Sequence, residues 1–171
     1  MAHQLKAIIT KDHSLNEFAN SYALHTPITF MHGFEMVALR DEDICRIFGV
    51  AAHEETLGNE RISPVFIAAL TELSKSMPFV YIETEYFGGE GTQFAFVFRD
   101  GVQQRVKEIP EGSPINDALA FMGLNTASGS KDAFDTLGLG RYRSVEAWIE
   151  ASELLQNTQK PASNPWWRFW G

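Results

Sequence analysis

The residues best placed for chemistry are two glutamates on one predicted strand. Glu83 and Glu85 lie two residues apart in an aromatic and β-branched stretch, so their carboxylates point to the same face of that strand. Two carboxylates held together can bind a cation or act as a general acid and a general base. The alternative interpretation places both glutamates on a solvent-exposed face, with the core formed by the opposite face at Val80, Ile82 and Thr84.

The strand that carries these glutamates belongs to a predicted β-hairpin over residues 78–101. Its glycine-rich turn, residues 88–91, allows a tight connection and places Glu90 at the mouth of the turn. The turn lacks the lysine and the helix N-terminus of a phosphate-binding loop, so we predict an architectural role for it. The pairing register decides which face is taken by the aromatic residues of the second strand, Phe94, Phe96 and Phe98.

Histidine and cysteine offer no metal-binding or nucleophile motif. The five histidines are scattered, with neither His-x-x-x-His nor His-Glu-x-x-His spacing. The nearest approach, His53-Glu54-Glu55, is predicted to lie in a solvated, mobile loop over residues 51–61. Cys45, the single cysteine, lies among the apolar positions of a predicted helix and is expected to be a small buried hydrophobe. We therefore predict no catalytic residue, no metal and no cofactor.

The chain has 171 residues, of which 44% are hydrophobic and 21% charged, and this composition predicts one globular domain. The formal net charge of −8 would repel a phosphate backbone, so nucleic acid is not an expected partner, whereas a basic protein would be attracted. The N-terminal residues turn polar before a signal-peptide core has formed, and no run approaches the length of a membrane-spanning helix. These features predict a cytoplasmic protein that does not enter a membrane.

The periodicities predict an α+β fold in which an antiparallel sheet is covered on one face by helices. Strands are expected at 5–10, across 28–39 with a break, in the hairpin at 78–101 and at 102–109. Helices are expected near 14–22, at 42–48, at 63–77, at 113–122 and at 144–155, and two of them open with Ser-Pro, which supplies an N-cap and a first-turn proline. The helices that begin at Ser63, Ser113 and Ser144 are predicted to cover the sheet.

The chain ends in an aromatic segment. The single domain is predicted to span residues 1–156, followed by a linker and tail over 157–171. Because so much aromatic surface is unfavourable in water, the tail is expected to dock on its own domain or on a protein partner, and one arginine beside an acidic domain argues against a membrane anchor. The large aromatic residues of this tail are Trp166, Trp167, Phe169 and Trp170.

Residues 80–93, Val-Tyr-Ile-Glu-Thr-Glu-Tyr-Phe-Gly-Gly-Glu-Gly-Thr-Gln, resemble a segment of small uncharacterised bacterial proteins, some of which look like immunity proteins of toxin systems. The resemblance covers about one tenth of the chain and carries no catalytic motif. It implies a small, acidic, cytoplasmic, non-catalytic protein that binds a cognate toxin and masks its active site.

Three functional hypotheses remain open. The first is a protein-binding inhibitor of the immunity type, which occludes a basic partner such as a toxin. The second is a small-molecule-binding protein or hydrolase that uses the Glu83/Glu85 face beside the glycine-rich turn, and the third is a structural subunit that self-associates through its tail. For the first hypothesis, the candidate partner-binding residues are acidic and aromatic: Glu54, Glu55, Glu60, Glu83, Glu85, Glu90, Trp166, Trp167, Phe169 and Trp170.

Overall fold

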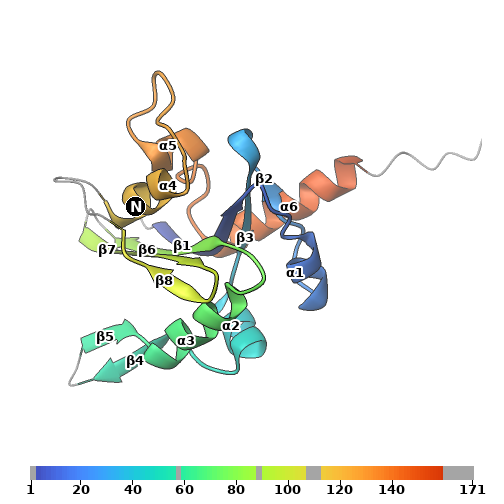
Figure 1. Ribbon diagram of the computed structural model, residues 1–171. Helices are drawn as coiled ribbons and strands as arrows, with labels where there is room; N and C mark the ends of the chain where they lie inside the picture. Colours follow the sequence, from blue (N-terminus) through green and yellow to red (C-terminus); the bar gives the residue numbers. More distant parts are fainter. Residues whose placement is uncertain (1–2, 57–58, 88–89, 107–112, 160–171) are drawn as a thin grey trace, which may run out of the picture.

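The computed structural model describes residues 3–56, 59–87, 90–106 and 113–159, which form an α+β fold around one six-stranded antiparallel sheet (Figure 1). The strand order is β2-β3-β1-β6-β7-β8, and a separate two-stranded sheet pairs β4 with β5. The α+β class and the antiparallel sheet are confirmed. The bounds of the strands are β1 His3–Lys11, β2 Ile28–Thr29, β3 Phe34–Ala38, β4 His53–Thr56, β5 Asn59–Ile62, β6 Phe79–Phe87, β7 Glu90–Arg99 and β8 Val102–Gln104.

The β6–β7 hairpin is the centre of this sheet, and its register is now defined. Glu83 pairs with Phe94 and Phe79 pairs with Phe98, without a slip along the whole hairpin. Since directly paired residues lie on the same face, the phenylalanines of β7 share the face of the two glutamates. Close to the turn, Gly91 has no room for a side chain, because an added Cβ would lie 2.0 Å from the carbonyl oxygen of Glu85.

Several helices begin at residues that favour a helix start, namely N-cap residues and first-turn prolines. Ser113 caps α4 by accepting a hydrogen bond from the backbone N–H of Asn116, and a proline follows in the first turn of both α3 and α4. In α2, the Asp43 carboxylate accepts the backbone N–H of Arg40 at 3.1 Å. The bounds of the helices are α1 Asn16–Ser21, α2 Asp41–Phe48, α3 Pro64–Leu73, α4 Pro114–Phe121, α5 Ala133–Leu137 and α6 Val145–Gln159, with a short 3-10 turn at Met31–Gly33.

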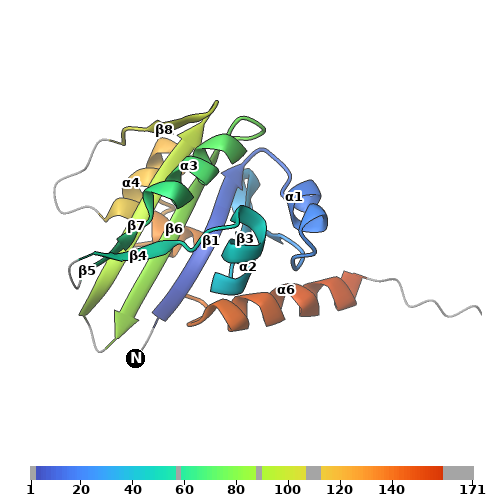
Figure 2. The same ribbon diagram turned by 90° about the horizontal axis from the view of Figure 1, so that it is seen from below.

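Helices cover both faces of the sheet, which corrects the prediction of a single covered face. Figure 2 shows α3 and α2 on one side of the strands and α4 and α6 on the other. Phe66 of α3 packs with Tyr81 and Phe98 of the sheet, whereas Trp148 of α6 packs in a second core cluster with Val80. The three helices predicted to share a face are therefore divided, because successive strand residues on both sides are apolar and each side needs cover.

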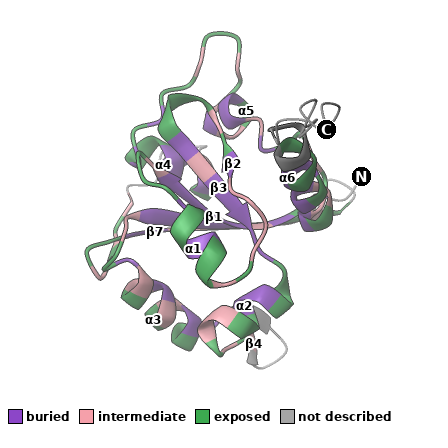
Figure 3. Cartoon of the chain, turned by 90° about the vertical axis from the view of Figure 1, so that its right-hand side faces the viewer, coloured by how far each residue is buried: buried purple, intermediate pink, exposed green. Residues whose placement is uncertain are grey.

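Burial follows this three-layer arrangement. The strands of the sheet are largely buried, while the outward sides of α1 and α3 are exposed (Figure 3). Cys45 is exposed on α2, so the prediction of a buried thiol is wrong. No helix in the described ranges is both long and apolar enough to cross a membrane.

The segment predicted as a mobile loop forms most of a second β-hairpin. β4 and β5 pair from His53 with Ile62 to Thr56 with Asn59. The strands were not predicted because this stretch is polar and shows no apolar alternation. A two-stranded hairpin on the surface can form from such residues, since it needs only a few apolar contacts with its neighbours. The last helix extends past residue 156 to Gln159, and the aromatic tail lies outside the described residues.

Candidate functional site

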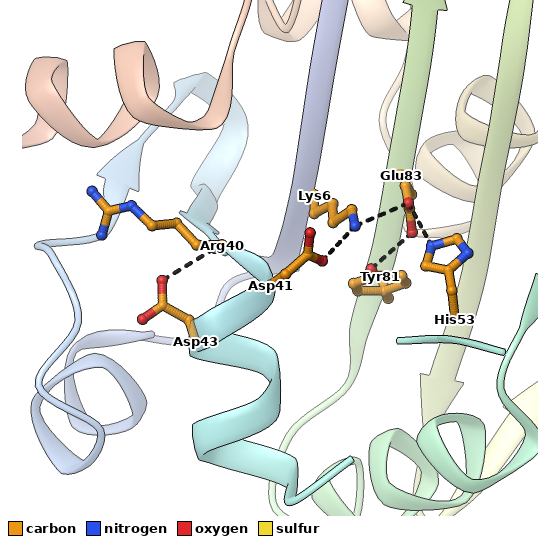
Figure 4. Close-up of polar contacts among 7 residues, drawn as sticks. All are labelled: Lys6, Arg40, Asp41, Asp43, His53, Tyr81 and Glu83. Atoms are coloured by element: carbon orange, nitrogen blue, oxygen red, sulfur yellow. Dashed lines mark hydrogen bonds and ion pairs between the residues drawn. The ribbon is translucent and has the colours of Figure 1, made fainter. Parts of the chain in front are cut away.

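Glu83 is buried at the centre of a polar cluster on the α1–α3 side of the sheet (Figure 4). Its Oε1 lies 2.7 Å from His53 Nε2 and 3.5 Å from Lys6 Nζ, and its Oε2 accepts a hydrogen bond from the Tyr81 hydroxyl at 3.1 Å. Because an ionised carboxylate can only accept, the proton in the histidine contact belongs to Nε2. The side chain of Glu83 is 6% exposed, so these contacts replace almost all of its hydration.

Four elements bring this cluster together. Lys6 on β1 is the direct cross-strand partner of Glu83 on β6, and Tyr81 lies two residues before Glu83 on the same face. His53 reaches the sheet from β4, and Asp41 at the start of α2 holds Lys6 Nζ at 2.5 Å. The cluster thus ties both β4 and the N-terminus of α2 to the sheet.

The charges in the cluster shift two pKa values. Burial is the largest cause for Tyr81 and, with the neighbouring Glu83 carboxylate, raises the pKa of its hydroxyl well above the ordinary value. Burial by itself lowers the pKa of Lys6, but the hydrogen bond to Asp41 and the charge of Glu83 outweigh it and raise the Lys6 pKa above its ordinary value. Tyr81 is therefore a neutral hydrogen-bond donor and Lys6 a cation over the whole physiological range.

The cluster surrounds one buried acceptor with three donors of the same chain. Glu83 is bonded to groups of its own chain and its side chain is only 6% exposed, which leaves little of its surface for a substrate. In the described ranges, no group of three or more His, Cys, Asp or Glu side chains is arranged to hold a metal ion. Three cavities are lined by described residues: one of about 470 Å³ between α1, α2 and α3, one of about 320 Å³ beside α1, and one of about 290 Å³ beside α6. None of the three is lined by Glu83 or Glu85.

Glu83 and Glu85 share a face of β6, as predicted, but they do not share an environment. Glu83 is buried and Glu85 is exposed, so the interpretation that placed both on a solvated face is wrong for Glu83. The histidine that contacts Glu83 lies 30 residues away in the sequence. That contact depends on where β4 packs, so no local spacing could have revealed it.

Beyond Glu83, the same face of the sheet opens to solvent. Gln4 pairs with Glu85 and Glu85 pairs with Thr92, and all three side chains are exposed. Phe87 follows on the same face and is 80% exposed. We call these four residues the open strand end; they lie where β1 begins, β6 ends and β7 begins (Figure 2).

The other predicted binding residues are placed only in part. Glu54 is half-buried on β4. Glu55, Glu60 and Glu90 lie on strands, but their side chains are outside the described part of the structure, as are the four aromatic residues of the tail. Of the predicted candidates, the structure therefore assigns Glu83 to the buried cluster and Glu85 to the open strand end. Phe87 was not among the candidates, although its position at the end of the strand, next to the turn, could have indicated it.

Comparisons of the chain with protein-family models, with curated proteins and with solved structures found no match.

Proposed function

We propose that this protein is a protein-binding inhibitor of the immunity type, which occludes a basic partner such as a toxin. The proposal depends on one observation above all: Phe87, on the same strand face as the exposed Glu85, is 80% exposed. An exposed aromatic side chain beside exposed polar and acidic residues matches the general anatomy of a protein interface. The open strand end is the proposed contact surface.

Phe87 is held in place before any partner arrives. It lies on β6 and its direct partner is Glu90 of β7, at the last pair before the turn. A side chain on a paired strand loses less conformational entropy on binding than one on a free loop. Burying an aromatic ring of this kind in a partner's pocket is worth about 2 kcal/mol or more, which is the range of an interface hot spot.

Three exposed carboxylates lie on the elements around the open strand end. Glu85 is exposed on β6, and Asp41 and Glu42 are exposed at the first turn of α2. Of the nearby cations, Lys6 is already paired with both Asp41 and Glu83 and its side chain is only 12% exposed, whereas Arg143, whose carbonyl oxygen accepts the N–H of Gln4, is exposed. This arrangement, on a chain of net charge −8, favours fast association with a basic surface.

The test is calorimetric titration of the full chain with the most basic small protein encoded beside its gene, at about 50 and about 300 mM NaCl. We expect affinity to fall at the higher salt, because exposed charges are screened. Phe87→Ala should weaken binding roughly thirtyfold and Glu85→Lys should reduce both affinity and its salt dependence.

Two matched variants control for loss of charge and of apolar surface. Glu146 is exposed on α6, and Glu146→Lys should leave the affinity within about twofold, apart from the general change in net charge. Val65 on α3 is 58% exposed, and Val65→Ala should have no effect on binding. Equal losses in Phe87→Ala and Val65→Ala, or binding that does not change with salt, would contradict the proposed function.

A further inference from the structure

The outer edge of β7 is paired for only part of its length. β6 pairs with β7 from Glu90 to Phe98, but β8 pairs only with residues 97–99 on the other side. Exposure rises gradually along the same stretch: Val97 and Phe98 are buried, residues 93–96 are half-buried, and Gly91 and Thr92 are exposed. Among the described strands, β8 is the one that pairs with this edge of β7, and it reaches residues 97–99. On this side, residues 91–96 are therefore not paired with any described strand.

The backbone groups that point outward along this edge can be identified from the hairpin geometry. Arg99 and Val102 are joined by a two-residue turn with positive φ at both positions, a type I′ hairpin. The closing pair of such a hairpin exchanges hydrogen bonds, so the N–H and C=O of Arg99 point toward β8. Since direction alternates along a strand, the N–H and C=O of Gly91, Gln93 and Ala95 point toward the same side of β7, where no described strand is paired with them.

Within residues 91–96 the strand itself lacks charge, proline and a bulge, three devices that prevent pairing with another chain. Residues 91–96 read Gly-Thr-Gln-Phe-Ala-Phe, without a charged residue or a proline. The β6–β7 register runs through them without a bulge. Natural edge strands are commonly protected by lysine, proline or a bulge, so a regular and uncharged edge of this length is suited to accept a strand.

We propose that residues 91–96 of β7 accept an extended segment of the basic partner as an added antiparallel strand. The inference rests on the proposed function, because the edge is continuous with the open strand end: Thr92 is the direct partner of Glu85 and Gly91 is the direct partner of Tyr86. Main-chain hydrogen bonds supply affinity in this mode of recognition, and alternate side chains supply specificity.

The two faces of the sheet define the chemistry of the added segment. On the face of Thr92, a strand added beside β7 lies two strand spacings, about 10 Å, from Glu85, which a lysine side chain can reach across Thr92. On the other face, the neighbouring side chain is Ala95, which packs at the border of the α4–α6 core with Val106. The segment that fits therefore alternates basic residues with apolar ones.

The first experiment uses a blocked peptide of alternating lysine and valine as the probe. Amide hydrogen exchange of the full chain is followed by NMR with and without the peptide. We expect added protection at the outward amides of Gly91, Gln93 and Ala95, and no change at Thr92 and Phe94, whose N–H groups already face β6. Protection that is equal at both sets, or absent from both, would overturn the proposal.

A pair of variants at one position separates the contribution of the backbone N–H to peptide binding from that of the side chain. Gln93→Pro removes an outward N–H without removing a hydrogen bond to β6, and Gln93→Ala removes the same side chain but keeps the N–H. We expect the peptide to bind Gln93→Pro at least tenfold more weakly than Gln93→Ala. Equal affinities would overturn the proposal, and the wild-type exchange pattern decides it if Gln93→Pro does not fold.

The outcomes separate this inference from the function on which it rests. If the basic partner protein binds with salt-sensitive affinity but does not distinguish Gln93→Pro from Gln93→Ala, the inhibitor function stands and strand addition is refuted. If no basic protein binds but the peptide protects the outward amides, the edge site stands and the inhibitor function fails. Protection that rises with protein concentration alone, together with a dimeric mass by light scattering, would assign the edge to a second copy and refute the partner assignment.

Discussion

Replacing Glu83 by glutamine is the sharpest test of the buried polar cluster. The substitution keeps the volume of the side chain but replaces two acceptor oxygens and a negative charge by one acceptor and an NH₂ donor. Three donors point at this carboxylate, from His53, Tyr81 and Lys6. One amide oxygen cannot satisfy all of them, so at least one buried donor must lose its acceptor.

The expected cost follows from the burial of these groups. Tyr81 is fully buried, and a buried donor left without an acceptor costs about 1–3 kcal/mol. Lys6 retains Asp41, which limits the electrostatic loss below the 3–5 kcal/mol typical of a broken buried ion pair. We therefore expect Glu83→Gln to lower the free energy of unfolding by about 2–4 kcal/mol.

Glu85→Gln is the matched control, because it makes the same chemical change two residues farther along the same face, where the side chain is exposed. It should change the free energy of unfolding by less than about 0.5 kcal/mol. Urea unfolding followed by circular dichroism measures both variants, with the slope of the transition checked for constancy. A loss below about 1 kcal/mol for Glu83→Gln, or equal losses for the two variants, would refute the assignment of Glu83 as the centre of the cluster.

Three further perturbations have defined outcomes. The folded-state pKa values of Tyr81 and Lys6 are both raised, so their contribution to stability is complete below the ordinary values of 10.0 and 10.5 and is lost as pH rises above them. The free energy of unfolding, measured from pH 8 to about 11.5, should show this loss, and Tyr81→Phe should make the loss smaller. Gly91→Ala forces the β6–β7 hairpin apart, because its Cβ would lie 2.0 Å from a backbone oxygen of β6, and should destabilise by about 1–3 kcal/mol in thermal unfolding; an unchanged midpoint would contradict the close approach. Ser113→Ala removes an N-cap hydrogen bond and should cost about 1 kcal/mol, whereas Ser63→Ala, at an N-cap without such a bond, should cost less in the same urea assay, and equal costs would contradict the capping assignment.

Much of the local structure could be predicted from the sequence because its causes are local. The Ser-Pro starts of α3 and α4 combine an N-cap with a proline that is tolerated only in the first turn. The β6–β7 hairpin follows from two β-branched and aromatic stretches on either side of glycines. By contrast, β4 and β5 were not predicted, because their residues are mostly polar and show no alternation of apolar and polar side chains. This hairpin is stabilised by tertiary contacts such as that of His53 with Glu83.

The sequence by itself determined the fold class, the central hairpin, the starts of the main helices and the acidic character of the chain, since these depend on neighbouring residues and on composition. Only the tertiary structure decided that helices cover both faces of the sheet and that the two glutamates of β6 differ, one bonded to His53 and Lys6 in the interior and the other exposed beside Phe87. The physical reason is that strand order and register determine these contacts, and both depend on the simultaneous burial of residues far apart in the chain.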